Sequence, residues 1–240
     1  MCGLIGFITN SKFNREVLIE VFVQSQIRGK HATGVSFYDE QGKLINISAP
    51  IPSKEFIQNF DFGSLPVNLR LSGHCRYSTS DLNYNQPLSS NNSSLVHNGV
   101  ITQEFPEKWE RHYGYKCETK NDSELLLRCL DELENPFIKF KGSSISAIYF
   151  NEDEFLFFRN GNRPLWWVKN EGFILIASTK NIIERTFKNL GIEIKNLNKC
   201  EAGIVYSIDE NLKVEGAKVS EEEERQVKLN SPDYYTKVII

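Results

Sequence analysis

Cys2 is the residue in this sequence best placed to act as a nucleophile, because it becomes the N-terminal residue if Met1 is removed. Methionine aminopeptidases accept small second residues such as cysteine, and the product would carry a thiol and a free α-amino group on one residue. An α-amino group titrates at roughly pH 8, so part of it is neutral at physiological pH and can accept the thiol proton. Gly3 leaves room for a substrate beside the thiol. The pattern predicts an amide-cleaving enzyme.

A small amide substrate with an amino acid head group would need a carboxylate clamp, an ammonium clamp and an oxyanion hole. Arg76 can pair with a carboxylate at two points, which a lysine cannot do. Asp122 could bind an ammonium group. The Asn98 side-chain amide and the Gly99 N–H could converge on an oxyanion, because the local sequence predicts a turn at residues 97–99.

Each of these groups also has a purely structural interpretation. Arg76 could form an exposed salt bridge, which contributes little to stability. Asn98-Gly99 is a common tight-turn dipeptide, and Asp122 could simply cap the helix predicted over residues 122–133. The residue types alone leave these alternatives open.

Composition limits the class of protein. The 240 residues are 40% hydrophobic and 25% charged, with a formal net charge of −3, so we expect no direct nucleic-acid binding. We expect one domain over residues 2–215 and an acidic polar tail over residues 216–240. The start shows neither a signal peptide nor a membrane span, so we expect a cytoplasmic protein without membrane association. The five cysteines are widely spaced, which favours neither disulfides nor zinc.

The hydrophobic pattern predicts an α+β protein. Residues 4–8 form a short apolar strand that would hold residue 2 in a fixed place. A second strand, residues 67–72, leads towards Arg76, and the chain from residue 144 onward reads as a meander of short strands. Strands and helices occur in separate runs, which favours antiparallel sheets with helices on their outer faces.

The motifs occur in an order that resembles the class II glutamine amidotransferase domain, an N-terminal nucleophile hydrolase, from residue 2 to about residue 208. They are most similar to those of the glutaminase domain of the amidophosphoribosyltransferases. The resemblance implies a four-layer αββα sandwich of two antiparallel sheets. The matching segments are Cys2-Gly3-Leu4-Ile5-Gly6, Arg28-Gly29 followed by Gly34, Gly73-His74-Cys75-Arg76-Tyr77-Ser78-Thr79, Gln86-Pro87, His97-Asn98-Gly99, Asn121-Asp122-Ser123-Glu124, Arg159-Asn160-Gly161-Asn162-Arg163-Pro164-Leu165 and Ala177-Ser178.

Carried over to these positions, the resemblance implies Cys2 as the nucleophile and Asn98 with the Gly99 N–H as the oxyanion hole. It implies that Arg76 binds the carboxylate of glutamine and that Asp122 binds its ammonium group. These roles agree with those assigned from the residue types.

Three further residues receive roles from the resemblance alone. Arg28 would support the terminal cysteine, and the backbone of Tyr77 and Ser78 would line the glutamine pocket. The sequence departs from the family pattern at His31, where the pattern has an aspartate two residues after Arg-Gly. This departure affects the expected local loop structure more than the chemistry of Cys2.

The implied reaction converts L-glutamine and water to glutamate and ammonia through a Cys2 thioester, without a metal or organic cofactor. The sequence contains no phosphate-binding loop for activating an acceptor, so we expect a separate synthase subunit to receive the ammonia. Two alternatives remain. The chain could be an N-terminal cysteine hydrolase of another γ-glutamyl amide, or a catalytically idle regulatory subunit.

Overall fold

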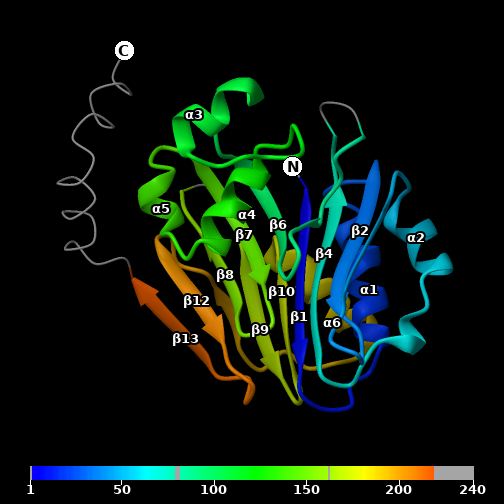
Figure 1. Cartoon of the computed structure of the whole chain (residues 1–240). Coiled ribbons are helices and arrows are strands. Elements are labelled where there is room, and N and C mark those ends of the chain that lie inside the picture. The colour runs from blue at the N-terminus through cyan, green and yellow to red at the C-terminus, as the bar shows by residue number, and fades with distance from the viewer. Residues whose placement is uncertain (1, 79–81, 162, 219–240) are drawn as a thin grey trace.

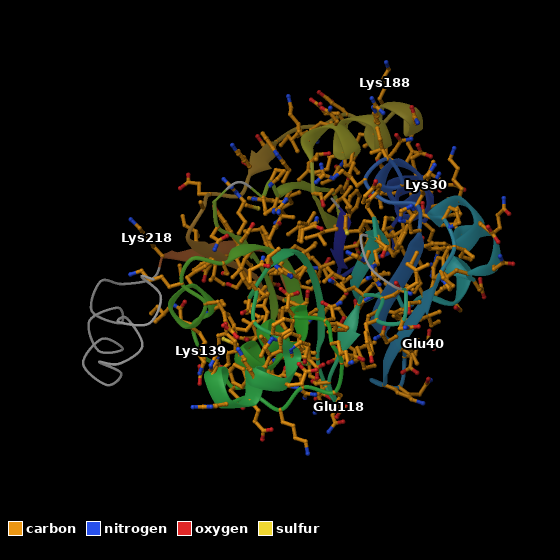
Figure 2. All side chains as sticks on the ribbon, turned by 90° about the horizontal axis from the view of Figure 1, so that it is seen from above. Lys30, Glu40, Glu118, Lys139, Lys188 and Lys218 are labelled. Atoms are coloured by element: carbon orange, nitrogen blue, oxygen red, sulfur yellow. The ribbon has the colours of Figure 1, made fainter. Side chains whose placement is uncertain are left out.

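The computed structural model describes residues 2–78, 82–161 and 163–218. These residues form a seven-stranded and a six-stranded sheet, both antiparallel, which stack with helices on their outer sides (Figure 1). The predicted α+β fold, a four-layer αββα sandwich, is confirmed. Charged side chains such as Lys188 and Lys218 extend outward at the periphery (Figure 2).

Each sheet draws its strands from distant parts of the chain. In spatial order, the seven-stranded sheet contains β11 (Leu197–Lys199), β9 (Trp166–Asn170), β10 (Phe173–Ala177), β1 (Gly3–Thr9), β4 (Leu69–Arg76), β2 (Ala32–Tyr38) and β3 (Leu44–Ala49). The six-stranded sheet contains β13 (Val214–Lys218), β12 (Ile204–Ile208), β8 (Phe155–Arg159), β7 (Ser144–Phe150), β6 (Ser94–Val100) and β5 (Leu88–Ser89).

The helices form the two outer layers. Side chains of α1, α2 and α6 share a hydrophobic core with the seven-stranded sheet, and side chains of α3, α4 and α5 share one with the six-stranded sheet. The helices are α1 (Glu16–Ser25), α2 (Ser53–Asn59), α3 (Trp109–Tyr113), α4 (Ser123–Asp131), α5 (Pro136–Lys139) and α6 (Lys180–Leu190), with short 3₁₀ helices η1 (Phe62–Ser64) and η2 (Pro106–Lys108).

β1 is buried on both faces, which explains its uninterrupted apolar sequence. Successive side chains of a strand point to opposite faces. Ile5 and Phe7 therefore pack in the core beneath α1 and α6, while Leu4 and Ile8 pack in a separate core between the two sheets. This double burial fixes the strand that directly follows Cys2.

The strand register brings several chain segments together at one end of the sandwich. Gly3 at the start of β1 lies opposite Cys75 near the end of β4, and Val100 at the end of β6 lies opposite Ser144 at the start of β7. The N-terminus lies at this same end (Figure 1). The motifs identified from the sequence occupy these element ends.

The predicted turn at residues 97–99 is wrong, because these residues belong to β6. Pairing with β7 places Asn98 opposite Ser146 and continues the strand to Val100, so tertiary pairing overrides the local turn preference of Asn-Gly. The sequence also did not predict α5, β5 or β11.

The predicted domain boundary at residue 215 falls within β13. Residues 219–240 of the predicted tail lie outside the described residues. Within the described ranges, the helices are all too short or too polar to cross a membrane.

Candidate active site

All eight predicted site residues line one cavity of about 320 Å³ at the end of the sandwich where the motifs converge. Seven further residues of the described ranges line it, and none of them had a predicted chemical role; they include His74, Gln86, His97 and Arg163. The eight predicted residues are Cys2, Arg28, Arg76, Tyr77, Ser78, Asn98, Gly99 and Asp122.

The Cys2 thiol contacts the main chain at the end of β4. The Tyr77 N–H donates to Cys2 Sγ at 3.4 Å, and the thiol can donate to the Tyr77 carbonyl oxygen at 3.8 Å. A backbone N–H directed at sulfur stabilises the thiolate, because hydrogen bonds to a charged acceptor are the stronger ones. Cys2 is half-buried, so its thiol lies within the cavity and stays accessible.

The main chain of Cys2 is held by Asn98 of the opposite sheet. Cys2 N donates to Asn98 Oδ1 at 3.2 Å, and Asn98 Nδ2 donates to the Cys2 carbonyl oxygen at 2.7 Å. Arg28 Nε also donates to this carbonyl oxygen, at 3.3 Å. Cys2 N is the amide nitrogen of the bond to Met1, so it occupies the place that the α-amino nitrogen takes after Met1 removal.

Ser178, which follows β10, completes this support. Its hydroxyl accepts the Leu4 N–H at 2.6 Å and lies 3.4 Å from the Cys2 carbonyl oxygen and 3.3 Å from Asn98 Nδ2. The sequence motif contained Ser178, but its contact with Cys2 across 176 positions of sequence had no local signal.

Gly99 presents a free edge of β6. Its register partner Ile145 donates its N–H to Asn160 Oδ1 and accepts the Asn160 N–H at its carbonyl. Opposed residues of an antiparallel pair exchange both ladder bonds or neither, so the Gly99 N–H points away from β7. Gly99 has φ +152°, and a Cβ there would lie 1.6 Å from the Ser144 carbonyl oxygen. Only glycine fits this position.

Arg76 and Asp122 place opposite charges in the cavity. Arg76 Nη1 donates to the Tyr84 carbonyl oxygen at 3.0 Å and to Asn85 Oδ1 at 2.7 Å. Asp122 Oδ2 accepts the Ile101 N–H at 2.6 Å, and its side chain does not cap α4. The helix-cap interpretation of Asp122 is therefore wrong.

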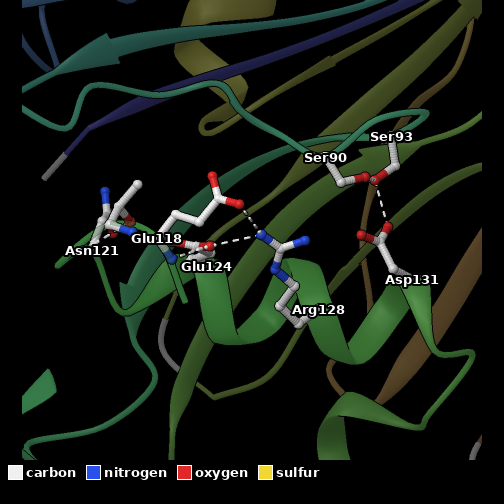
Figure 3. A network of polar contacts seen from close by, with 8 residues as sticks. Ser90, Ser93, Glu118, Asn121, Glu124, Arg128 and Asp131 are labelled. Atoms are coloured by element: carbon white, nitrogen blue, oxygen red, sulfur yellow. Dashed lines mark hydrogen bonds and ion pairs between the residues drawn. The ribbon is translucent and has the colours of Figure 1, made fainter. Parts of the chain in front are cut away.

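α4, which carries Asp122 at its start, is anchored by a network of polar contacts (Figure 3). Glu124 accepts the backbone N–H groups of Glu118 and Thr119 and pairs with Arg128 at 3.0 Å. Burial alone would raise the pKa of Glu124, but these donors outweigh burial and hold it below its usual value. At the other end of α4, Ser93 Oγ donates to Asp131 Oδ1.

His97 is buried and fixed in one tautomer. Its Nε2 lies 3.3 Å from the Ser144 carbonyl oxygen, which can only accept, so Nε2 carries the proton and Nδ1 accepts from Ser123 Oγ at 2.9 Å. Gln86 donates to the same hydroxyl at 3.2 Å. Burial lowers the pKa of His97 and Arg163 adds to this, against Asp122 and the Ser144 carbonyl. The imidazole is therefore neutral.

His74 forms part of the cavity wall and is 1% exposed, yet neither ring nitrogen has a hydrogen-bond partner among the described residues. Burial lowers its pKa to about 3, and the charges of Arg76 and His97 act in the same direction. His74 is therefore neutral at physiological pH.

Cys2 is the thiol that the cavity exposes. Cys75 is fully buried on the helix-facing side of β4, and burial raises its pKa to about 12. Burial also raises the pKa of Cys117 and of Cys129 to about 12, and raises that of Cys200. These four thiols stay protonated, which agrees with a packing role.

Comparisons with known proteins support one family. A family model described as a glutamine amidotransferase domain matches residues 74–185. Glutamine–fructose-6-phosphate aminotransferase (isomerizing) of Helicobacter pylori is 26% identical over 204 residues, which cover 76% of this chain and 33% of that protein. Amidophosphoribosyltransferase of Pasteurella multocida is 30% identical over 149 residues, which cover 59% of this chain and 29% of that protein.

Solved structures share the fold. Glutamine phosphoribosylpyrophosphate amidotransferase from B. subtilis superposes with a TM-score of 0.70 at 21% identity, over 91% of this chain and 49% of that one. A glutamine aminotransferase class II domain protein from Silicibacter pomeroyi gives 0.60 at 11% identity, over 91% of this chain and 100% of that one.

Residues 74–185 match the glutamine amidotransferase domain model, and the chain is similar to class II glutamine amidotransferase domains in sequence and fold. It spans about a third of the length of the curated relatives described above.

The buried histidines should make the fold sensitive to mild acid. Below about pH 6.5 the unfolded chain protonates His74 and His97, whereas the folded chain does not, so unfolding takes up protons. The free energy of unfolding should be highest above pH 6.5. It should fall by about 1 kcal/mol per pH unit for each histidine as the pH drops towards 5. Urea unfolding at pH 7, 6 and 5 measures this slope.

His74→Asn should give a shallower slope between pH 7 and pH 5, because it removes one titrating group. Gln41→Asn, an exposed position without a titrating side chain, is the control and should keep the wild-type slope. A wild-type stability that does not change over this range would contradict the assignment of two neutral buried imidazoles.

Proposed function

We propose that this chain hydrolyses the side-chain amide of L-glutamine to glutamate and ammonia in the cytosol, through a thioester on Cys2. The supporting observation is that the Cys2 thiol shares one cavity with a possible oxyanion hole and with two opposite charges, Arg76 and Asp122. Glutamine carries a carboxylate, an ammonium group and an amide, so each has a candidate partner. No step requires a metal or an organic cofactor.

Arg76 would bind the α-carboxylate of glutamine and Asp122 would bind its ammonium group. Both side chains are already held by main-chain groups, Arg76 by the Tyr84 carbonyl and Asp122 by the Ile101 N–H. Substrate binding then orders few side chains, which favours a productive geometry. The main chain at Tyr77 and Ser78 would line the glutamine pocket. Arg28 would support Cys2 through its hydrogen bond to the Cys2 carbonyl oxygen.

In the proposed reaction the α-amino group of Cys2 takes the thiol proton, and the thiolate attacks the amide carbon. Asn98 Oδ1, which accepts a hydrogen bond from Cys2 N, would orient this amine. The oxygen of the tetrahedral intermediate would receive the Gly99 N–H and one N–H of Asn98 Nδ2, which would give up its 3.3 Å contact with Ser178 Oγ for this. The C–N bond breaks, ammonia leaves with the proton from the amine, and water then cleaves the thioester to release glutamate.

Cys2→Ala should reduce ammonia release from glutamine by about three orders of magnitude or more, because it removes the nucleophile. The assay should use protein whose intact mass shows that Met1 has been removed. Cys117→Ala is the matched control, since it removes a thiol outside the cavity and should keep the activity. Equal ammonia release by wild type and Cys2→Ala would refute the proposal. Faster hydrolysis of another γ-glutamyl amide than of glutamine would favour the alternative hydrolase.

Arg76→Lys should raise the KM for glutamine roughly 10- to 100-fold, with a smaller change in kcat, because one point charge replaces a two-point pairing. 4-Aminobutanamide lacks the α-carboxylate, and glutaramate lacks the ammonium group. Wild type should discriminate against both. Arg76→Lys should lose discrimination against the first only, and Asp122→Asn against the second only. Unchanged discrimination in both variants would contradict these assignments.

We also propose that the ammonia passes to a separate synthase subunit that covers the mouth of the cavity. Large apolar side chains are exposed around it: Tyr77, which lines the cavity, at 50%, and next to lining residues Ile27 at 70% and Val100 at 36%. Exposed apolar side chains grouped at a functional opening favour a protein contact. Such a contact would also keep ammonia from escaping into water.

Glutamine labelled with ¹⁵N in its amide, added to native extract with excess unlabelled ammonium, should transfer its label to an aminated product. Ile27→Glu should reduce this transfer several-fold without changing basal ammonia release, because a charge at the contact weakens docking. Leu133→Glu, at the other end of α4 and 81% exposed, is the control and should transfer normally. If the aminated product carries no more ¹⁵N than the free ammonium pool, the ammonia is not passed directly to a bound partner and the proposal is contradicted.

A further inference from the structure

His31 lies at the point where β2 begins, beside the last residues of β4. Its N–H donates to the Arg76 carbonyl oxygen at 3.0 Å, and its Nδ1 accepts the Ser78 N–H at 3.0 Å. The His31 ring lies 5.0 Å from the Tyr77 ring, measured between centroids. His31 therefore holds the chain on both sides of Tyr77.

The two peptide groups that flank Tyr77 each connect His31 to the Cys2 sulfur. In the first, the Arg76 carbonyl accepts from His31 N and the Tyr77 N–H donates to Cys2 Sγ at 3.4 Å. In the second, the Tyr77 carbonyl lies 3.8 Å from Cys2 Sγ and the Ser78 N–H donates to His31 Nδ1. A closed ring of four hydrogen bonds thus runs from the imidazole to the thiol and back.

The two peptide groups are held in different ways. The first is packed by Gly29, where a Cβ would lie 2.2 Å from the Arg76 carbonyl carbon. The second follows Tyr77, whose side chain is 50% exposed, and its Ser78 N–H donates to the acceptor that His31 supplies.

We propose that His31 is a positioning residue for the Cys2 thiol, acting through the main chain of Tyr77. This inference rests on the proposed glutaminase function for its effect on catalysis. An acceptor at Nδ1 requires that the ring proton sits on Nε2, so the imidazole acts as a neutral acceptor. The aspartate that the family pattern has at this position would place a negative charge beside the thiol, whereas the neutral His31 ring does not.

Three variants with Met1 removed separate the acceptor from the ring. His31→Ala removes both, His31→Phe keeps a ring beside Tyr77 without an acceptor, and His31→Asn keeps a side-chain acceptor without the imidazole. We expect His31→Ala and His31→Phe to lower kcat for glutamine hydrolysis roughly three- to ten-fold, with a smaller change in KM, as for the loss of one hydrogen bond. His31→Asn should stay within about two-fold of wild type.

The rate of Cys2 alkylation by iodoacetamide, read by mass spectrometry, gives a second measurement that does not depend on glutamine. It should fall in His31→Ala and His31→Phe and recover in His31→Asn. If wild type does not hydrolyse glutamine but alkylation follows this pattern, the glutaminase function fails and the positioning role stands. If His31→Phe matches wild type in both alkylation and kcat, the positioning role is refuted. A folded His31→Asn as slow as His31→Phe would refute it equally.

Discussion

The two-point contact between Asn98 and the main chain of Cys2 is the interaction on which the site depends. Cys2 precedes the central strand of one sheet, whereas Asn98 lies in the other sheet. The contact therefore forms only when the two sheets are stacked at the correct spacing. Leu4 and Val96, each two positions away, pack in the core between the sheets and set that spacing. The hydrophobic core thus determines where Cys2 lies.

The same sheet end also provides groups that the ladder does not use. Asn160 occupies the hydrogen-bonding groups of Ile145, so Gly99 keeps its N–H for the cavity side. The close approach of the Ser144 carbonyl then excludes every side chain at residue 99. Glycine is required here by packing as much as by backbone conformation. The way in which β6 and β7 end therefore leaves the Gly99 N–H directed at the cavity, where it can donate to an anion.

The sequence was sufficient for the fold class and for eight of the residues that line the cavity, but not for the contacts that hold them in place. Apolar runs such as residues 4–8 predicted buried strands, because a strand that is buried on both faces needs apolar residues at successive positions. Asn98-Gly99 was assigned to a turn, since a local preference carries no information about pairing with β7. Ser178 and Arg163 lay within recognised motifs, yet their contacts with Cys2 and Ser144 join segments distant in sequence.

The charged and polar side chains that line the cavity are arranged in a way that lowers the stability of the folded chain. Its described lining carries three arginines, Arg28, Arg76 and Arg163, but one carboxylate, Asp122. Burial lowers the pKa of Arg28, the Cys2 thiolate opposes this, and Arg163 adds to the lowering. His74 adds a buried imidazole that has no hydrogen-bond partner in the described part of the chain, which also costs folding free energy. A ligand carboxylate beside these arginines would offset part of the excess positive charge, so binding of such a ligand would stabilise the folded chain. This imbalance is the expected consequence of shaping a site for its ligand rather than for the free protein.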